Sequence, residues 1–76
     1  MCRYFFDLVG QKRTEYDFRG REISSLEDAF QMAEIIALDL ELKSEGEWRG
    51  WSVEVRNSDG RHLFSVAVQS VDVIAA

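Results

Sequence analysis

The feature that most constrains the fold of this chain is a long run from Leu26 to Lys43 that contains neither Gly nor Pro. Apolar residues recur in it at the three- and four-residue intervals of an α-helix, at Leu26, Ala29, Phe30, Ala33, Ile36, Ala37 and Leu40. Its later part, Ile35–Leu42, also alternates apolar and polar residues, as a half-buried strand would. A strand there would have to begin without a turn, whereas a helix continues the established period. We therefore predict a helix that ends near Lys43 or Ser44, with Gly46 close to its C-cap.

The start of this helix is marked by two overlapping capping boxes. Ser24 with Glu27, or Ser25 with Asp28, has the spacing in which a hydroxyl and an acidic side chain cap the first turn. The carboxylates also suit the positive end of the helix dipole. Either pairing predicts a first helical turn at Leu26.

Two alternating segments precede the helix, Arg3–Leu8 and Thr14–Phe18, with a turn at Gly10 between them. Aromatic residues in strict alternation are typical of strands with one buried face, so we expect a β-hairpin. The side chains expected to point inward are Tyr4, Phe6, Leu8, Tyr16 and Phe18, and those expected to point outward are Arg3, Phe5, Asp7, Glu15 and Asp17.

Two further strands follow the helix. Trp51–Val55 alternates with its odd-numbered residues inward, and the turn Asn57–Gly60 leads to a last strand at His62–Val68. Residues 69–76 either extend that strand or form a frayed tail. The inward side chains of these two strands are expected to be Trp51, Val53, Val55, Phe64, Val66 and Val68.

The order of elements predicts an α+β fold of ββαββ type, with one helix packed on one face of a four-stranded antiparallel sheet. The strand order within the sheet is left open. We expect residues 1–76 to form a single small domain. A chain this short buries only roughly 60% of its unfolded surface, so self-association would add to a marginal core.

The net charge of -5 argues against a general nucleic-acid binder, which needs a basic face. The one cysteine, Cys2, can form neither an internal disulfide nor a thiolate metal site by itself. The N-terminal residues lack the long apolar stretch of a signal peptide or a membrane span. These features favour a cytoplasmic protein with no cofactor and no membrane or nucleic-acid partner.

A second apolar stripe is the best functional clue in the sequence. At about 100° per residue, Ile35, Leu38 and Leu42 fall on the side of the helix opposite to the expected core face, and Met32 lies between the two faces. A row of branched aliphatic side chains facing water usually marks a partner surface. We expect a homodimer through Ile35, Leu38, Leu42 and Met32; the alternative is that Val71, Val73 and Ile74 of the tail cover the stripe.

A second candidate partner surface lies on the sheet face away from the helix. Phe5 and Leu63 are apolar there, with Arg3 and Arg56 beside them and Trp48 near the sheet edge. Such a surface suits protein contacts, or pairing of an edge strand with another chain.

Catalytic chemistry has little support in the sequence. His62 is the only histidine, and no Ser-His-Asp or Cys-His spacing accompanies it, so a surface histidine is the simpler interpretation. Asp7, Glu15 and Asp17 can meet on the outer face of the first hairpin, where cross-strand pairing with Arg56 is the simpler interpretation. No metal-ligand spacing is present. We predict that the protein is not an enzyme, with acid–base chemistry on the hairpin carboxylates as the alternative.

Several short motifs resemble a family of short uncharacterised bacterial proteins. They are RYFFD near the start, the turn Asp17–Ile23, the Ala-containing helix, and the strand and turn WSVEVRNSDGR. The resemblance covers most of the chain and implies the ββαββ pattern. Cys2 and Ser24 stand where this family often has Pro. Because the family is a domain of unknown function, the resemblance implies no activity and no catalytic residue.

These features together predict a small non-enzymatic protein that acts through protein–protein contacts and self-associates through the outer face of its helix. The alternative is a small regulatory or antitoxin-like module that binds a different, basic protein.

Overall fold

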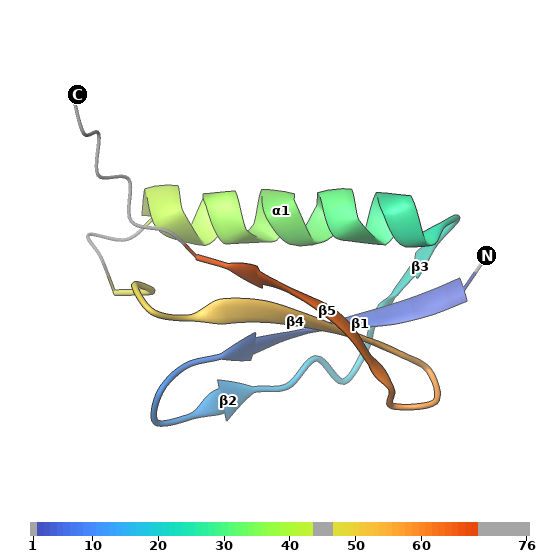
Figure 1. Ribbon diagram of the computed structural model, residues 1–76, viewed down its shortest axis with the longest axis horizontal. Helices are drawn as coiled ribbons and strands as arrows, with labels where there is room; N and C mark the ends of the chain where they lie inside the picture. Colours follow the sequence, from blue (N-terminus) through green and yellow to red (C-terminus); the bar gives the residue numbers. More distant parts are fainter. Residues whose placement is uncertain (1, 44–46, 69–76) are drawn as a thin grey trace.

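The computed structural model of the protein describes residues 2–43 and 47–68. One helix, α1 (Leu26–Lys43), lies across one face of an antiparallel sheet (Figure 1). The strands are β1 (Cys2–Val9), β2 (Thr14–Glu15), β3 (Arg21–Ile23), β4 (Ser52–Asn57) and β5 (His62–Ala67). The α+β fold and the strand–strand–helix–strand–strand pattern predicted from the sequence are confirmed. Residues 69–76, expected to form an extension or a tail, lie outside the described residues.

The sheet has the order β2-β1-β4-β5, and β3 also pairs with β1. β2 pairs with the end of β1 at Leu8–Val9, and β3 pairs with its beginning at Cys2–Tyr4. The other edge of β1 is occupied by β4 along Tyr4–Val9. Of the second predicted strand, Thr14–Phe18, only Thr14–Glu15 pairs with β1. β3, which was not predicted, pairs farther along the same edge, and residues 16–20 leave the sheet between the two short strands.

The core lies between the sheet and α1. Tyr4 and Phe6 of β1 and Val53 and Val55 of β4 are buried there, as the alternation predicts, and Leu8 packs against them half-buried. α1 contributes small side chains, since its buried residues are Ala29, Ala33 and Ala37. An alanine face lets a helix approach a sheet closely, and Met32, Ile36 and Leu40 of α1 also pack, half-buried, against the core.

Ser25 caps the beginning of α1. Its Oγ accepts a hydrogen bond from the backbone N–H of Asp28 at 3.1 Å, and its carbonyl accepts one from the N–H of Ala29 at 3.0 Å. The Oγ of Ser24 donates to Oδ2 of Asp28 at 2.8 Å. Of the two pairings predicted from the sequence, the structure therefore has Ser25 as the N-cap with Asp28 at the third helical position, and the Asp28 carboxylate accepts from Ser24.

Four predicted inward positions are wrong. Leu26 and Phe30 of α1 are 52% and 42% exposed: Leu26 is the first residue of the helix, and Phe30 lies against β5, the last strand, beyond which no described strand covers it. Phe30 packs there on Phe64 with a ring-centroid distance of 5.4 Å. Tyr16 and Phe18 are 60% and 86% exposed because the ladder ends at Glu15 and strand alternation no longer applies beyond it.

Candidate functional site

The outer face of α1 exposes a row of aliphatic side chains. The exposed fractions of Ile35, Leu38 and Leu42 are 59%, 51% and 68%. We call these three residues the helix stripe. Met32, which was expected to belong to the same surface, is half-buried and packs against the core. Its Sδ atom accepts a hydrogen bond from Nη1 of Arg21 at 3.5 Å. The structure therefore brings together three of the four predicted interface residues.

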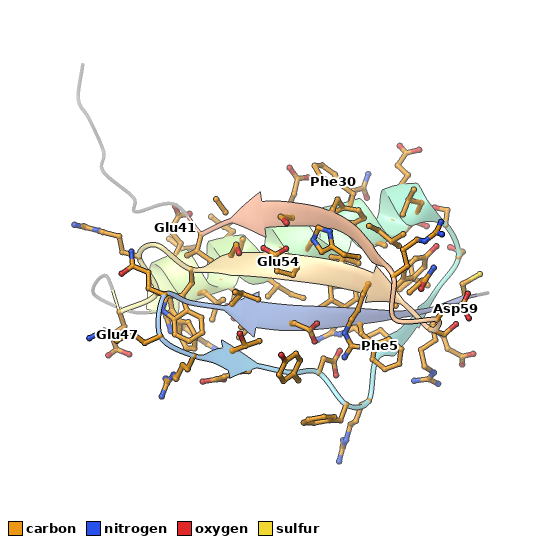
Figure 2. All side chains as sticks on the ribbon, turned by 60° about the horizontal axis from the view of Figure 1, so that its bottom comes forward. Phe5, Phe30, Glu41, Glu47, Glu54 and Asp59 are labelled. Atoms are coloured by element: carbon orange, nitrogen blue, oxygen red, sulfur yellow. The ribbon has the colours of Figure 1, made fainter. Side chains whose placement is uncertain are left out.

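Three residues of the second predicted surface meet on the sheet face that turns away from α1. The guanidinium of Arg56 lies 4.7 Å from the ring centroid of Phe5, its cross-strand partner (Figure 2). Arg3 donates a hydrogen bond to the carbonyl of Arg19 and lies 3.9 Å from the carboxylate of Glu22. These side chains are engaged in contacts within the fold, which reduces what they can offer to a partner.

Leu63 and Trp48 do not join that surface. The register of β4 and β5 shifts between Val55 and Arg56, so Leu63 is an extra residue in the pairing and packs against the core. A bulge of this kind redirects a side chain to the other face of a sheet. Trp48 packs edge-on against Trp51, with ring centroids 4.6 Å apart, and also contacts the core. The sequence places Leu63 wrongly because alternation is counted through the bulge.

A buried carboxylate is the feature that sequence reasoning missed on this face. Asp7 is only 5% exposed, although it was expected on a solvated strand face. Its Oδ2 accepts a hydrogen bond from Nε of Arg56 at 2.7 Å, and its Oδ1 accepts one from the backbone N–H of Asp17 at 2.9 Å. Nη2 of Arg56 donates to the carbonyl of Asp17 at 3.0 Å. The pair Asp7–Arg56 thus ties the segment of residues 16–20 to the sheet.

The side chain of Asp17 completes this connection. Its Oδ2 accepts a hydrogen bond from the N–H of Phe6 at 3.2 Å, and its Oδ1 accepts from the N–H groups of Arg19 and Gly20 at 3.0 Å. Burial acts to raise the pKa of Asp17, but the hydrogen bonds from Gly20, Phe6 and Arg19, with the charge of Arg21, outweigh burial. The pKa of Asp17 therefore lies below its ordinary value of 3.8.

The lowered pKa of Asp17 predicts a specific dependence of stability on pH. A carboxyl whose pKa is lower in the folded state stabilises the fold above its unfolded pKa, and this stabilisation is lost as pH falls through the folded pKa. We expect Asp17→Asn to be less stable than the wild type at neutral pH. The difference in unfolding free energy should shrink between about pH 6 and about pH 2 in urea titrations.

The control for this experiment is Glu22→Gln. Glu22 is 61% exposed in its side chain and belongs only to the long pair with Arg3, so its replacement should leave the pH profile almost unchanged. A constant difference between Asp17→Asn and wild type across the acid range would contradict the assigned role of Asp17.

A second polar cluster, on β4 and β5, has the residue types of a hydrolytic site but not the geometry. Nε2 of His62 lies 2.6 Å from Oε1 of Glu54 and 3.1 Å from Oγ of Ser65. A catalytic triad uses one ring nitrogen for the acid and the other for the hydroxyl. Here one nitrogen faces both groups, and Ser65 also donates directly to Glu54.

The carboxylate of Glu54 is hydrogen-bonded by three neighbouring side chains. Burial acts to raise its pKa, but hydrogen bonds from Ser52, Ser65 and His62 outweigh burial and keep the pKa of Glu54 below its ordinary value of 4.5. Glu54 therefore stays ionised as an acceptor. His62 lies at the start of β5 with 56% of its side chain exposed, in agreement with a surface histidine.

The carboxylates of the first hairpin do not form a cation site. Asp7 and Asp17 are linked through a backbone hydrogen bond, whereas Glu15 pairs with Arg13 at 3.4 Å. Among the residues that the structure describes, no group of three or more His, Cys, Asp and Glu side chains is arranged to hold a metal ion.

A groove of about 610 Å³ opens between α1 and the divided edge strand. The segment of residues 16–20 leaves the sheet there, so the edge of β1 is not covered by a continuous strand. Apolar side chains of β1 and α1 form the inner wall, and the exposed part of the lining is Glu15, Tyr16, Arg19, Arg21, Ile35 and Asp39.

The fold and these surfaces define a small α+β protein with an apolar helix face that is exposed in the part of the chain that the structure describes. Residues 3–69 match the family described as Domain of unknown function (DUF6894), and the chain belongs to this family. No curated protein and no solved structure matches the chain. Within residues 2–43 and 47–68, no helix is long and apolar enough to cross a membrane.

Proposed function

We propose that this protein is a cytoplasmic, non-enzymatic protein that acts through protein contacts and self-associates through the helix stripe. The observation that supports this proposal is the distribution of side chains on α1. The helix buries three alanines and packs Met32, Ile36 and Leu40 half-buried against the core, but it exposes a second aliphatic row, Ile35, Leu38 and Leu42. A helix in a self-sufficient two-layer domain would bury its large aliphatic residues.

Burial of the helix stripe would contribute substantially to so small a protein. Complete burial of a Leu or Ile side chain is worth about 1.5–3 kcal/mol, and these three are already partly covered. The gain is therefore about 1 kcal/mol for each side chain, or about 3 kcal/mol for each protomer. An isologous contact, in which two copies of α1 cross near Leu38, buries the same three residues on both sides.

The non-enzymatic part of the proposal rests on the polar clusters. The oxygens of Asp7 and Asp17 already accept hydrogen bonds from Arg56 and from backbone N–H groups. The carboxylate of Glu54 accepts hydrogen bonds from the hydroxyls of Ser52 and Ser65 and from His62. Groups that are satisfied in this way act as connectors within the fold rather than as acids or bases for a substrate.

Leu38→Glu should convert a dimer into a monomer, because the stripe would then bury a charge on each protomer. Light scattering on a sizing column, over a concentration series, would measure the molar mass against the monomer value of 8.8 kDa. Leu26→Glu is the matched control, since Leu26 and Leu38 are 52% and 51% exposed on different sides of the same helix. A wild-type chain that remains monomeric at all concentrations would contradict the proposal, as would equal loss of association in both variants.

A different, basic protein is the second candidate partner, in a small regulatory or antitoxin-like role. The helix carries five acidic residues and a single lysine, and Asp39 already pairs with Lys43 at 3.2 Å. The dependence of binding on salt concentration distinguishes self-association from binding of a basic partner. Salt screens repulsion between two acidic helices and should strengthen self-association, whereas it should weaken attachment of a basic partner.

A further inference from the structure

A basic hollow lies at the end of the sheet where the β1–β2 turn meets residues 47–50. It has a volume of about 370 Å³ and is lined by Gln11, Lys12, Arg13, Arg49 and Trp51. Three of the nine basic residues of the chain therefore surround one indole, although the chain as a whole carries a net charge of -5. The lining residues that the structure describes include no carboxylate.

The indole of Trp51 is held in place from two directions. A Cβ atom on Gly10 would lie only 2.5 Å from Cε2 of the ring, so the absence of a side chain at Gly10 lets the backbone pack directly against it. Trp48 packs edge-on at 4.6 Å between ring centroids, with an interplanar angle of 70°. Arg13 lies with its guanidinium 5.4 Å from the Trp51 centroid. The ring thus forms a fixed aromatic wall beside the cations.

The cations of the hollow are available to a ligand. Arg13 forms an exposed pair with Glu15 at 3.4 Å, which water and salt weaken. Lys12 and Arg49 form no salt bridge with the carboxylates that the structure describes, and both are exposed. Glu47 lies at the same end of the molecule (Figure 2) but does not line the hollow.

We propose that this hollow binds a phosphate monoester attached to a planar ring, for which a nucleoside monophosphate is the simplest example. A phosphate monoester carries a charge of about −1.5 to −2 at neutral pH and matches several nearby Lys and Arg donors. The planar ring stacks on the face of the Trp51 indole that the exposed Arg13 covers, and the Arg13 guanidinium turns to the phosphate. The acidic remainder of the surface repels an extended polyanion, so a single nucleotide fits better than a nucleic-acid strand. None of the lining residues belongs to α1, so this site is independent of the helix stripe.

Tryptophan fluorescence tests this proposal directly, because Trp51 lines the hollow and the other tryptophan of the chain, Trp48, packs against it. AMP added to the full chain, excited where adenine does not absorb, should quench the emission saturably with a Kd below about 1 mM. Adenosine and inorganic phosphate, each lacking one half of the ligand, should bind at least about tenfold more weakly. The indole N–H resonance of Trp51 in NMR spectra should shift with the same saturation curve.

The exposed basic side chains of the hollow can be replaced to test the proposal, because their removal leaves the core intact. Arg49→Ala and Lys12→Ala should each weaken AMP binding by about five- to tenfold. Arg61→Ala is the matched control: Arg61 follows the β4–β5 turn that contains Asp59, at the opposite end of the molecule (Figure 2), and its removal should leave binding unchanged. Lack of saturation up to about 10 mM AMP, equal affinity for inorganic phosphate and AMP, or equal weakening by Arg61→Ala would each overturn the proposal.

Discussion

Replacement of Asp7 by alanine is expected to lower the free energy of unfolding by about 3 kcal/mol. Asp7 is 5% exposed and accepts hydrogen bonds from Nε of Arg56 at 2.7 Å and from the N–H of Asp17 at 2.9 Å. Without the carboxylate, a largely covered guanidinium keeps only neutral contacts, such as the carbonyl of Asp17, and the backbone N–H of Asp17 loses its partner. Arg56 keeps 27% of its side chain exposed, which holds the expected cost at the lower end of the range for buried ion pairs.

Urea denaturation of wild type and Asp7→Ala measures this cost. Asp39→Ala is the matched control, because Asp39 forms its 3.2 Å pair with Lys43 on the surface of α1 with 59% of its side chain exposed. Its loss should cost only about 0.3–0.5 kcal/mol. A cost below about 1 kcal/mol for Asp7→Ala would mean that the burial of Asp7 is not coupled to stability.

The double variant Asp7→Ala/Arg56→Ala measures how much of the stabilisation comes from the interaction between the two side chains. Once one partner is gone, removal of the other leaves no new unpaired charge, so the double variant should cost less than the sum of the single variants. We expect a coupling of about 1–3 kcal/mol for groups in direct contact. Strict additivity would indicate that Asp7 and Arg56 stabilise the fold independently of one another.

The sequence was sufficient for the parts of the fold that depend on regular periodicity. The helix has the predicted start at Leu26 and the predicted end at Lys43, because capping residues and an unbroken apolar period specify a helix locally. The burial of Tyr4, Phe6, Val53 and Val55 also follows from a local pattern. β1 and β4 are regular strands, so every second side chain faces the core. The row Ile35, Leu38 and Leu42 is exposed because its position follows from helical geometry alone.

The sequence could not indicate where regular pairing is interrupted. Alternation placed Tyr16 and Phe18 inward, whereas hydrogen bonds that the carboxylate of Asp17 accepts and a turn at Gly20 take that segment out of the sheet. Alternation also placed Leu63 on the outer face, but the bulge in β5 turns it toward the core. Both errors arise from long-range contacts, because neither the register shift nor the hydrogen bond between Phe6 and Asp17 lies within a local window.

Gly20→Ala should destabilise the fold more than Gly60→Ala, although both glycines have a positive φ, at 70° and 82°. A non-glycine residue in this region costs about 1–2 kcal/mol at either position. A Cβ atom on Gly20 would also lie 2.8 Å from Cγ of Arg3 and 2.9 Å from Cε2 of Phe5, whereas none of the described atoms lies within 4 Å of a Cβ on Gly60. The Phe5 ring cannot move away freely, because Arg56 covers it at 4.7 Å.

Crowding of this kind adds about 1–3 kcal/mol, so the two variants should differ by at least about 1 kcal/mol in unfolding free energy. Urea denaturation would measure the difference, and hydrogen exchange at the N–H of Asp17 would locate it. That N–H donates to Asp7 at 2.9 Å, so its exchange should accelerate in Gly20→Ala beyond the change in global stability. An equal loss of unfolding free energy in the two variants would show that the segment of residues 16–20 shifts to accept the Cβ atom without disturbing Arg3 or Phe5. The close approach of Gly20 to β1 would then be incidental to the burial of Asp7, rather than the reason that a glycine is required there.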